Sequence, residues 1–117
     1  MVKKYFLALN DNYSMKLLQK SDTVSRTELR EMAEKMGGLV KAVVDIKKGC
    51  MMVDADLHAD QEAKLLQEGS NQDDLWGINL YPDETADFIE YDSMINIRPR
   101  QNNKTRGVED EKTREEI

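Results

Sequence analysis

The segment from residue 98 to residue 106 is basic, although the formal net charge of the whole chain is −6. It contains no acidic residue, and its cations and amides are Arg98, Arg100, Lys104, Arg106, Gln101, Asn102 and Asn103. A guanidinium group can bind phosphate or carboxylate through two parallel hydrogen bonds. The segment therefore predicts a site for a small anionic ligand, such as a nucleotide or a phosphorylated metabolite. Pro99 turns the chain, so we expect Arg98, Arg100 and Arg106 to converge on that ligand.

The same arginines have a second interpretation, in which they pair with the protein's own carboxylates. Glu109 and Asp110 follow the basic segment closely and are the first candidates as partners. The segment would then be a structural clasp in a non-enzymatic, homo-oligomeric interaction module, whose seven methionines supply the contact surface. Both interpretations remain open at the level of the sequence.

Polar and apolar residues alternate from Phe88 to Arg98, as expected for a half-buried strand. Asn79, Asn96 and Arg98 would lie on the polar face, where the two amides orient the anion. Glu90 and Asp92 lie on the same face, and residues two apart on a strand are separated by roughly 6 to 7 Å. That separation is compatible with catalysis by two carboxylates, although two acids on an exposed strand face are also common without a function.

His58 is the only histidine, and it lies in an acidic stretch with Asp54, Asp56, Asp60 and Glu62. Carboxylates bind hard cations and imidazole binds transition metals. The spacing matches no calcium-binding loop and one histidine is too few for a histidine-rich zinc site, so we expect no metal. Asp56 or Asp60 is more simply the cap of a helix. His58 is a candidate general acid or base, because its ordinary pKa lies near neutrality, or else a buried structural residue.

Two strands joined at Pro82-Asp83 would position most of these side chains. Placing Tyr81 opposite Phe88 puts Asn79 opposite Glu90 and Trp76 opposite Ser93. Trp76 would then be buried against Ser93 and the first helix, since a large ring packs well against a small residue.

The rest of the chain predicts two helices and three more strands. Ser25 and Glu28 form a capping box for a helix that runs to about Met36 and ends at Gly37-Gly38. A second helix ends near Glu68. The expected strands cover 15–19, 39–46 and 50–54, the last two joined at Lys47-Lys48-Gly49. This order, roughly β-α-β-β-α-β-β-α, predicts an α+β fold: a mostly antiparallel sheet of about four or five strands with both main helices on one face.

Length and composition favour one small soluble domain. The chain has 117 residues, and we expect an arm or edge strand at 1–23, a compact domain at 24–107 and a polar tail or short helix at 108–117. The single cysteine excludes an internal disulfide and fits the cytoplasm. The acidic balance disfavours nucleic acid and membrane surfaces as partners. We recognise no cofactor-binding motif, so no cofactor is expected.

Four segments stand out after about Val24: V-K-A-V-V-D-I, D-L-H-A-D-Q-E-A-K-L-L-Q-E-G-S, D-L-W-G-I-N-L-Y-P and I-N-I-R-P-R-Q-N-N-K-T-R-G-V-E-D. Through these segments the chain resembles a family of small prokaryotic proteins known only as a domain of unknown function. The resemblance implies a single compact domain and brings no activity with it.

Overall fold

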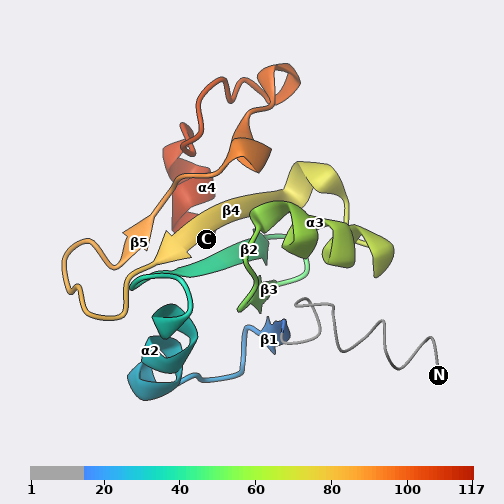
Figure 1. Ribbon diagram of the computed structural model, residues 1–117. Coiled ribbons are helices and arrows are strands. Elements are labelled where there is room, and N and C mark those ends of the chain that lie inside the picture. The colour runs from blue at the N-terminus through green and yellow to red at the C-terminus, as the bar shows by residue number, and fades with distance from the viewer. Residues whose placement is uncertain (1–14) are drawn as a thin grey trace.

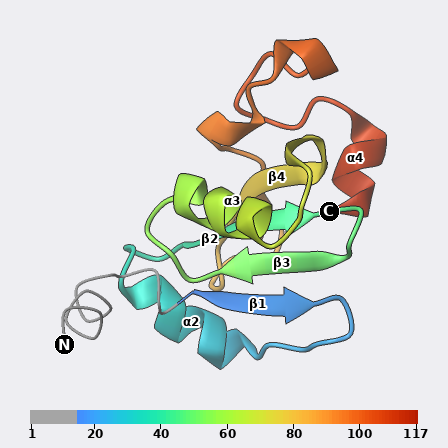
Figure 2. The ribbon, with the colours of Figure 1, turned by 90° about the vertical axis from the view of Figure 1, so that its right-hand side faces the viewer.

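The computed structural model describes residues 15–117, which form a five-stranded sheet and three α-helices (Figure 1). The elements are β1 (Lys16–Gln19), α2 (Arg26–Glu34), β2 (Val40–Asp45), β3 (Cys50–Val53), α3 (His58–Gln67), β4 (Leu75–Leu80), β5 (Ile89–Glu90) and α4 (Glu111–Glu116). The strand order is β1-β3-β2-β4-β5, and every neighbouring pair is antiparallel. Figure 2 shows β3 between β1 and β2. The predicted α+β fold is confirmed. Most of the predicted N-terminal arm, residues 1–14, lies outside the described residues.

The two main helices pack on opposite faces of the sheet, so their predicted placement on one face was wrong. Leu29 of α2 packs with Val40, Ala42 and Val44, which alternate along β2. Leu65 of α3 belongs to a second cluster, with Val43, Met52, Cys50 and Leu75. Because neighbouring side chains of a strand point to opposite faces, a central strand that is apolar on both faces needs cover on both.

Helix α2 begins with a side-chain cap and helix α3 begins without one. The capping box before α2 is confirmed: the Glu28 N–H donates to Ser25 Oγ over 3.0 Å, and the Ser25 N–H donates to Glu28 Oε1 over 3.3 Å. Helix α3 begins after Leu57, without any side-chain cap. The predicted caps, Asp56 and Asp60, were therefore wrong, and Asp60 lies inside the first turn instead.

The segment after the Pro82-Asp83 turn keeps the predicted register for only two residue pairs. Asn79 lies opposite Glu90 and Leu80 lies opposite Ile89. The chain then leaves the sheet, and two 3₁₀ helices, Met94–Asn96 and Pro99–Gln101, replace the predicted strand.

The loss of the strand inverts the expected burial of its residues. Ile89 and Ile97, predicted to face the core, are each 38% exposed. Asn96 and Arg98, predicted to lie on an open polar face, are 0% and 5% exposed. Ser93 packs against Gly77 rather than Trp76, so closely that a Cβ added at Gly77 would lie 2.5 Å from the Ser93 Cβ.

Candidate functional site

A row of hydrogen-bonded residues runs along the edge formed by β4, β5 and the following loop; we call it the polar strip. Its side chains bond one another except at Asp92, where the Asn79 Nδ2 donates to the backbone carbonyl over 3.4 Å. Its members are Tyr81, Glu90, Asn79, Asp92 and Arg106. The Tyr81 hydroxyl and the Asn79 Nδ2 both donate to Glu90 Oε1, over 2.8 and 2.9 Å. The Arg106 Nε donates to Asp92 Oδ1 over 2.6 Å, and this pair is exposed. The fold thus joins two predicted ligand residues, Asn79 and Arg106, with the two candidate catalytic carboxylates.

His58 reaches the same region from the first turn of α3. Its Nε2 donates to the Ile78 carbonyl over 2.7 Å, because a carbonyl oxygen can only accept. The side chain is 8% exposed, and its pKa is lowered. Burial is the largest cause; the bond to Ile78 raises the pKa, Lys41 lowers it, Asp92 raises it and Arg106 lowers it. The structure therefore shows a buried, hydrogen-bonded histidine, which is one of the two predicted alternatives, and a role as general acid or base stays a prediction.

Two buried amide oxygens near His58 lack a hydrogen-bond partner. One is Oδ1 of Asn79, a residue that is 5% exposed, and the other is Oε1 of the fully buried Gln61. Gln61 donates through Nε2 to the Lys41 carbonyl over 2.8 Å, and Lys41 pairs with Asn79 across the sheet. Buried polar groups are normally satisfied by protein or by water, and within residues 15–117 no donor reaches either oxygen.

Arg98 has a structural role rather than a place in the polar strip. Its two terminal nitrogens donate to the carbonyls of Gln72 and Leu75, the latter over 2.6 Å. Its guanidinium carbon lies 4.2 Å from the centre of the Trp76 ring. Burial lowers the pKa of Arg98, while Glu62, Asp73 and Asp74 act against that effect. Trp76 is buried as predicted, but it is Arg98 that covers its ring.

Asn96 also holds backbone rather than an open site. Its carboxamide accepts from the Gly77 N–H over 2.8 Å and donates to the Gly77 carbonyl over 2.9 Å. It donates again to the Arg106 carbonyl, over 2.9 Å. One side chain thereby takes the place of a neighbouring strand at the edge of β4 and ties the basic loop to it.

Arg98 and Arg100 both donate to Gln72, one to its carbonyl and the other to its Oε1, whereas Arg106 lies apart on Asp92, so the three arginines do not converge as predicted. Arg100 pairs with Asp73 over 2.7 Å in an exposed ion pair. The predicted partners, Glu109 and Asp110, pair with none of the three arginines. Glu109 accepts from the backbone N–H groups of residues 104 and 105, and Asp110 caps α4.

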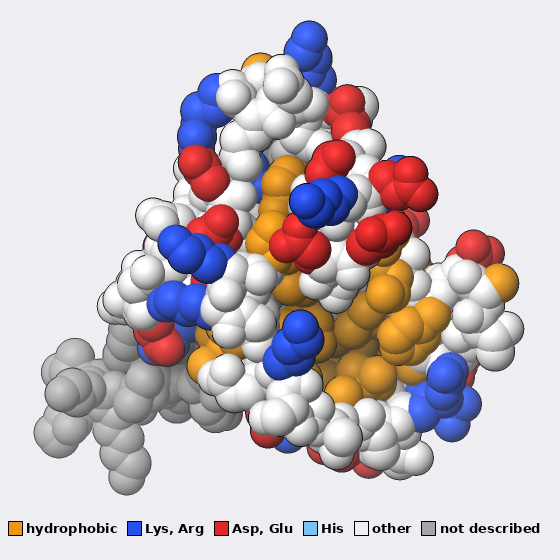
Figure 3. Space-filling model, turned by 180° about the vertical axis from the view of Figure 1, so that it is seen from behind, with side chains coloured by type: hydrophobic (Ala, Val, Ile, Leu, Met, Phe, Trp, Pro, Cys, Tyr) orange, Lys and Arg blue, Asp and Glu red, His pale blue; other side chains and the backbone are white. Residues whose placement is uncertain are grey.

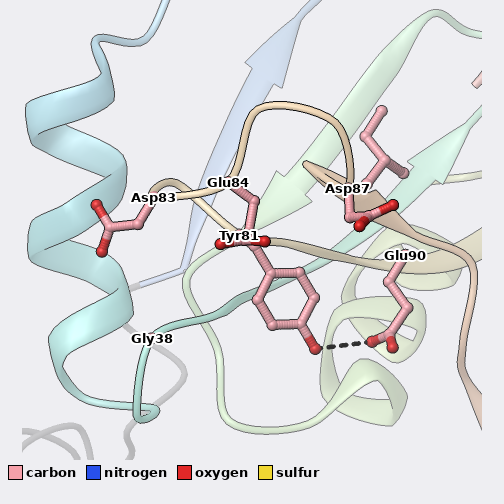
Figure 4. A pocket seen from close by; sticks show the side chains of 7 residues that line it. Gly38, Tyr81, Asp83, Glu84, Asp87 and Glu90 are labelled. Atoms are coloured by element: carbon pink, nitrogen blue, oxygen red, sulfur yellow. Dashed lines mark hydrogen bonds between the residues drawn. The ribbon is translucent and has the colours of Figure 1, made fainter.

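An open pocket of about 540 Å³ adjoins the Tyr81 end of the polar strip (Figure 4). Its lining residues are Gly38, Tyr81, Asp83, Glu84, Asp87, Ile89 and Glu90. Figure 4 shows the Tyr81 ring beside the loop at Gly38 and its hydroxyl on Glu90, while Asp83 points towards α2. The sequence interpretation missed this pocket. The available signal was the density of acids between Pro82 and Phe88, which a turn brings together.

A hydrophobic hollow lies on the face opposite to α3 (Figure 3). Leu18, Val44, Ile46, Met51 and Ile117 line a cavity of about 160 Å³ there. The hollow adjoins the core cluster of α2. Self-association through apolar surface stays a prediction that these observations do not test.

A family model described as "Protein of unknown function (DUF5674)" matches residues 16–117. The chain belongs to this family. The match covers β1 to α4 and so includes the whole polar strip and the acidic pocket. No match was found among curated proteins or among solved structures.

The other acidic residues predicted near His58 do not form a common site. Lys35 pairs with Asp54 over 3.0 Å at the end of β3. In residues 15–117, no three or more His, Cys, Asp or Glu side chains are grouped so that they could hold a metal ion. Within the same range no helix has the length and apolar character needed to cross a membrane.

Proposed function

We propose that this protein binds a small anionic ligand, such as a nucleotide or a phosphorylated metabolite, at the Arg106 end of the polar strip. The observation that carries the proposal is the position of Arg106. Its side chain is 55% exposed, and it is oriented by a single bond from Nε to Asp92. Its terminal nitrogens form no hydrogen bond with the described residues, so the two-point edge of the guanidinium faces outward.

The surroundings of Arg106 support an anion rather than a second carboxylate of the chain. Lys41 and Arg106 both lower the pKa of His58 and Asp92 raises it, so two cations and one carboxylate act on the buried imidazole. Asn79 lies behind these charged side chains, where its Nδ2 donates to Glu90 Oε1 and to the backbone carbonyl of Asp92 and so holds the two acidic residues in place beside Arg106. Of the residues predicted to bind the anion, Asn79 and Arg106 therefore remain in the proposed site, while Asn96, Arg98 and Arg100 support the loop that presents it.

The test is phosphate binding by an Arg106→Gln variant, followed by melting temperature and by amide chemical shifts. Arg114→Gln is the matched control, because Arg114 is exposed on α4 and the substitution removes the same charge. We expect inorganic phosphate and a nucleoside monophosphate to raise the melting temperature of the wild type and of Arg114→Gln, and not that of Arg106→Gln. An equal rise in all three proteins would contradict a site at Arg106.

A further inference from the structure

Glu109 occupies an anion-binding position in the loop that carries Arg106. Its Oε2 accepts hydrogen bonds from the N–H of Lys104 over 2.6 Å and from the N–H of Thr105 over 3.1 Å. Two successive backbone N–H groups that point at one oxygen form a nest, an arrangement that binds oxyanions. The bond from the Lys104 N–H is the largest cause of the lowered pKa of Glu109, so the nest holds this carboxyl group as an anion.

The nest keeps its shape through Asn103 rather than through the Glu109 side chain. Asn103 is 3% exposed, and its Nδ2 donates to the carbonyls of Thr105 and Gly107 over 3.2 and 2.7 Å. Its Oδ1 accepts from the backbone N–H of Glu109 over 2.9 Å. A buried amide thus holds the backbone on both sides of the nest. The Glu109 side chain can therefore leave without undoing the turn, which makes it an occupant of the nest and not a part of its frame.

The nest and the proposed anion site lie in the same exposed part of the loop. The Cα atoms of residues 104 and 106 are at most about 7.6 Å apart, because consecutive Cα atoms are about 3.8 Å apart. The terminal nitrogens of Arg106 form no hydrogen bond with the described residues, and its pair with Asp92 is exposed, so the guanidinium can reorient at little cost. Four exposed side chains surround this point: Lys104, Thr105, Arg106 and Glu109.

A carboxylate tethered in the nest selects among the anions that can replace it. Glu109 is five residues from Lys104 and four from Thr105, so its effective concentration at the nest is on the order of millimolar or higher. A free carboxylate brings the same single charge and gains nothing by exchange. A phosphate monoester brings about two negative charges and three acceptor oxygens, so it can bond the nest and a guanidinium at once. Phosphate is therefore the class of anion that can displace Glu109.

We propose that the phosphate group of the ligand displaces Glu109 from the nest and is then held by the backbone N–H groups of Lys104 and Thr105 together with Arg106. Glu109 is in this way an internal competitor, which closes the site to simple carboxylates in the free protein. This inference rests on the proposed function, since it assumes that Arg106 binds the same anion.

The test is a titration with methyl phosphate and with acetate, followed by calorimetry and by the amide chemical shifts of residues 104 and 105. Glu109→Ala empties the nest. Glu115→Ala on α4 is the matched control, because it removes the same charge from an exposed position. We expect Glu109→Ala to bind methyl phosphate about tenfold more tightly than the wild type and the control do, since the tethered competitor is gone.

Methyl phosphate should shift the amides of residues 104 and 105 in the wild type and in Glu109→Ala, whereas acetate should shift them in Glu109→Ala alone. Glu109→Gln keeps the shape of the side chain and loses its charge, so its affinity for methyl phosphate should lie between the other two. This variant also supplies the comparison if Glu109→Ala does not fold.

Equal affinity for methyl phosphate in the wild type and both Glu109 variants, with binding still lost in Arg106→Gln, would overturn the role of the nest and leave the proposed function standing. Acetate binding by the wild type as tight as that by Glu109→Ala would overturn the role of Glu109 as a competitor. Phosphate binding that Arg106→Gln does not weaken, in the wild type and in the Glu109→Ala background alike, would overturn the proposed function itself.

Discussion

Strand β4 and the segment from residue 88 to residue 106 both keep their backbone polar groups paired, but they do so by different means. β4 is in register with β2 over six residue pairs, from Leu75 to Leu80. The later segment has a ladder of only two pairs. Beyond it, side-chain amides of Asn96 and Asn103 bond the backbone, with Asn103 Nδ2 donating to the Asn96 carbonyl over 2.8 Å.

A loop held by side-chain amides can orient its other side chains in ways that a strand cannot. A strand must send alternate side chains to two fixed faces. A loop held by buried amides can instead direct Arg98 inward over Trp76 and Arg106 outward beside Asp92. The polar strip depends on this arrangement, because Asn96 also holds the Arg106 carbonyl. The amide hydrogen bonds of Asn96 and Asn103 are therefore the structural condition for the proposed site. Removing them should abolish the difference between this loop and a strand.

Asn96→Ala is expected to produce the largest loss of stability. It leaves the N–H and carbonyl of Gly77 and the carbonyl of Arg106 without partners in a buried region. Each buried unsatisfied group costs about 1 to 3 kcal/mol, so we expect a total of about 3 to 6 kcal/mol, measured by urea unfolding. Asn71→Ala, at an exposed asparagine with no side-chain cap bond, is the control and should have little effect. A loss below about 1 kcal/mol for Asn96→Ala would mean that the loop does not depend on this amide.

The parts of the fold that follow from local rules could be predicted from the sequence. The capping box at Ser25 and the hairpin between β2 and β3 depend on residues close in the chain, and the family resemblance was also confirmed. The register of β4 and β5 was right where the turn at Pro82 fixes it.

What could not be predicted depends on contacts distant in sequence. Alternation records side-chain polarity and not whether the backbone is paired, so Phe88 to Arg98 resembled a strand. Gly77 was the overlooked signal, because a glycine inside a strand often marks a close approach, here by Ser93 and Asn96. The predicted register was right in placing Asn79 opposite Glu90. The predicted site residues treated His58 separately, since nothing near position 58 indicates that α3 packs beside the polar strip.

Arg98→Ala should cause the second largest loss of stability. It contrasts a buried cation of the loop with an exposed one. The substitution leaves the carbonyls of Gln72 and Leu75 without their partners and uncovers Trp76, so we expect a loss of about 2 to 4 kcal/mol. The loss should be equal with and without sulfate, because the partners are internal. Arg100→Ala is the matched control, since it removes an exposed ion pair and should leave the urea midpoint nearly unchanged. A loss that appears or grows only when sulfate is added, because sulfate then stabilises the wild type and not the variant, would instead place an external anion at Arg98.

The smallest expected effect is the pH dependence that His58 contributes to stability. His58 is a buried base beside the polar strip, in contrast with the exposed carboxylates around it. Its pKa in the folded protein is lowered from 6.5, so at intermediate pH the unfolded chain binds more protons than the folded one. Stability is then complete above 6.5 and falls as the pH drops from that value to the folded pKa, below which the loss is constant. Unfolding free energies at about pH 8 and about pH 5.5 should differ more for the wild type than for His58→Gln, because the chain has no other histidine. All other groups are the same in the two proteins, so their contributions cancel in that difference. Identical pH dependence in the two proteins would show that His58 accepts its proton as easily when folded as when unfolded, and would contradict the burial that is the largest cause of its lowered pKa.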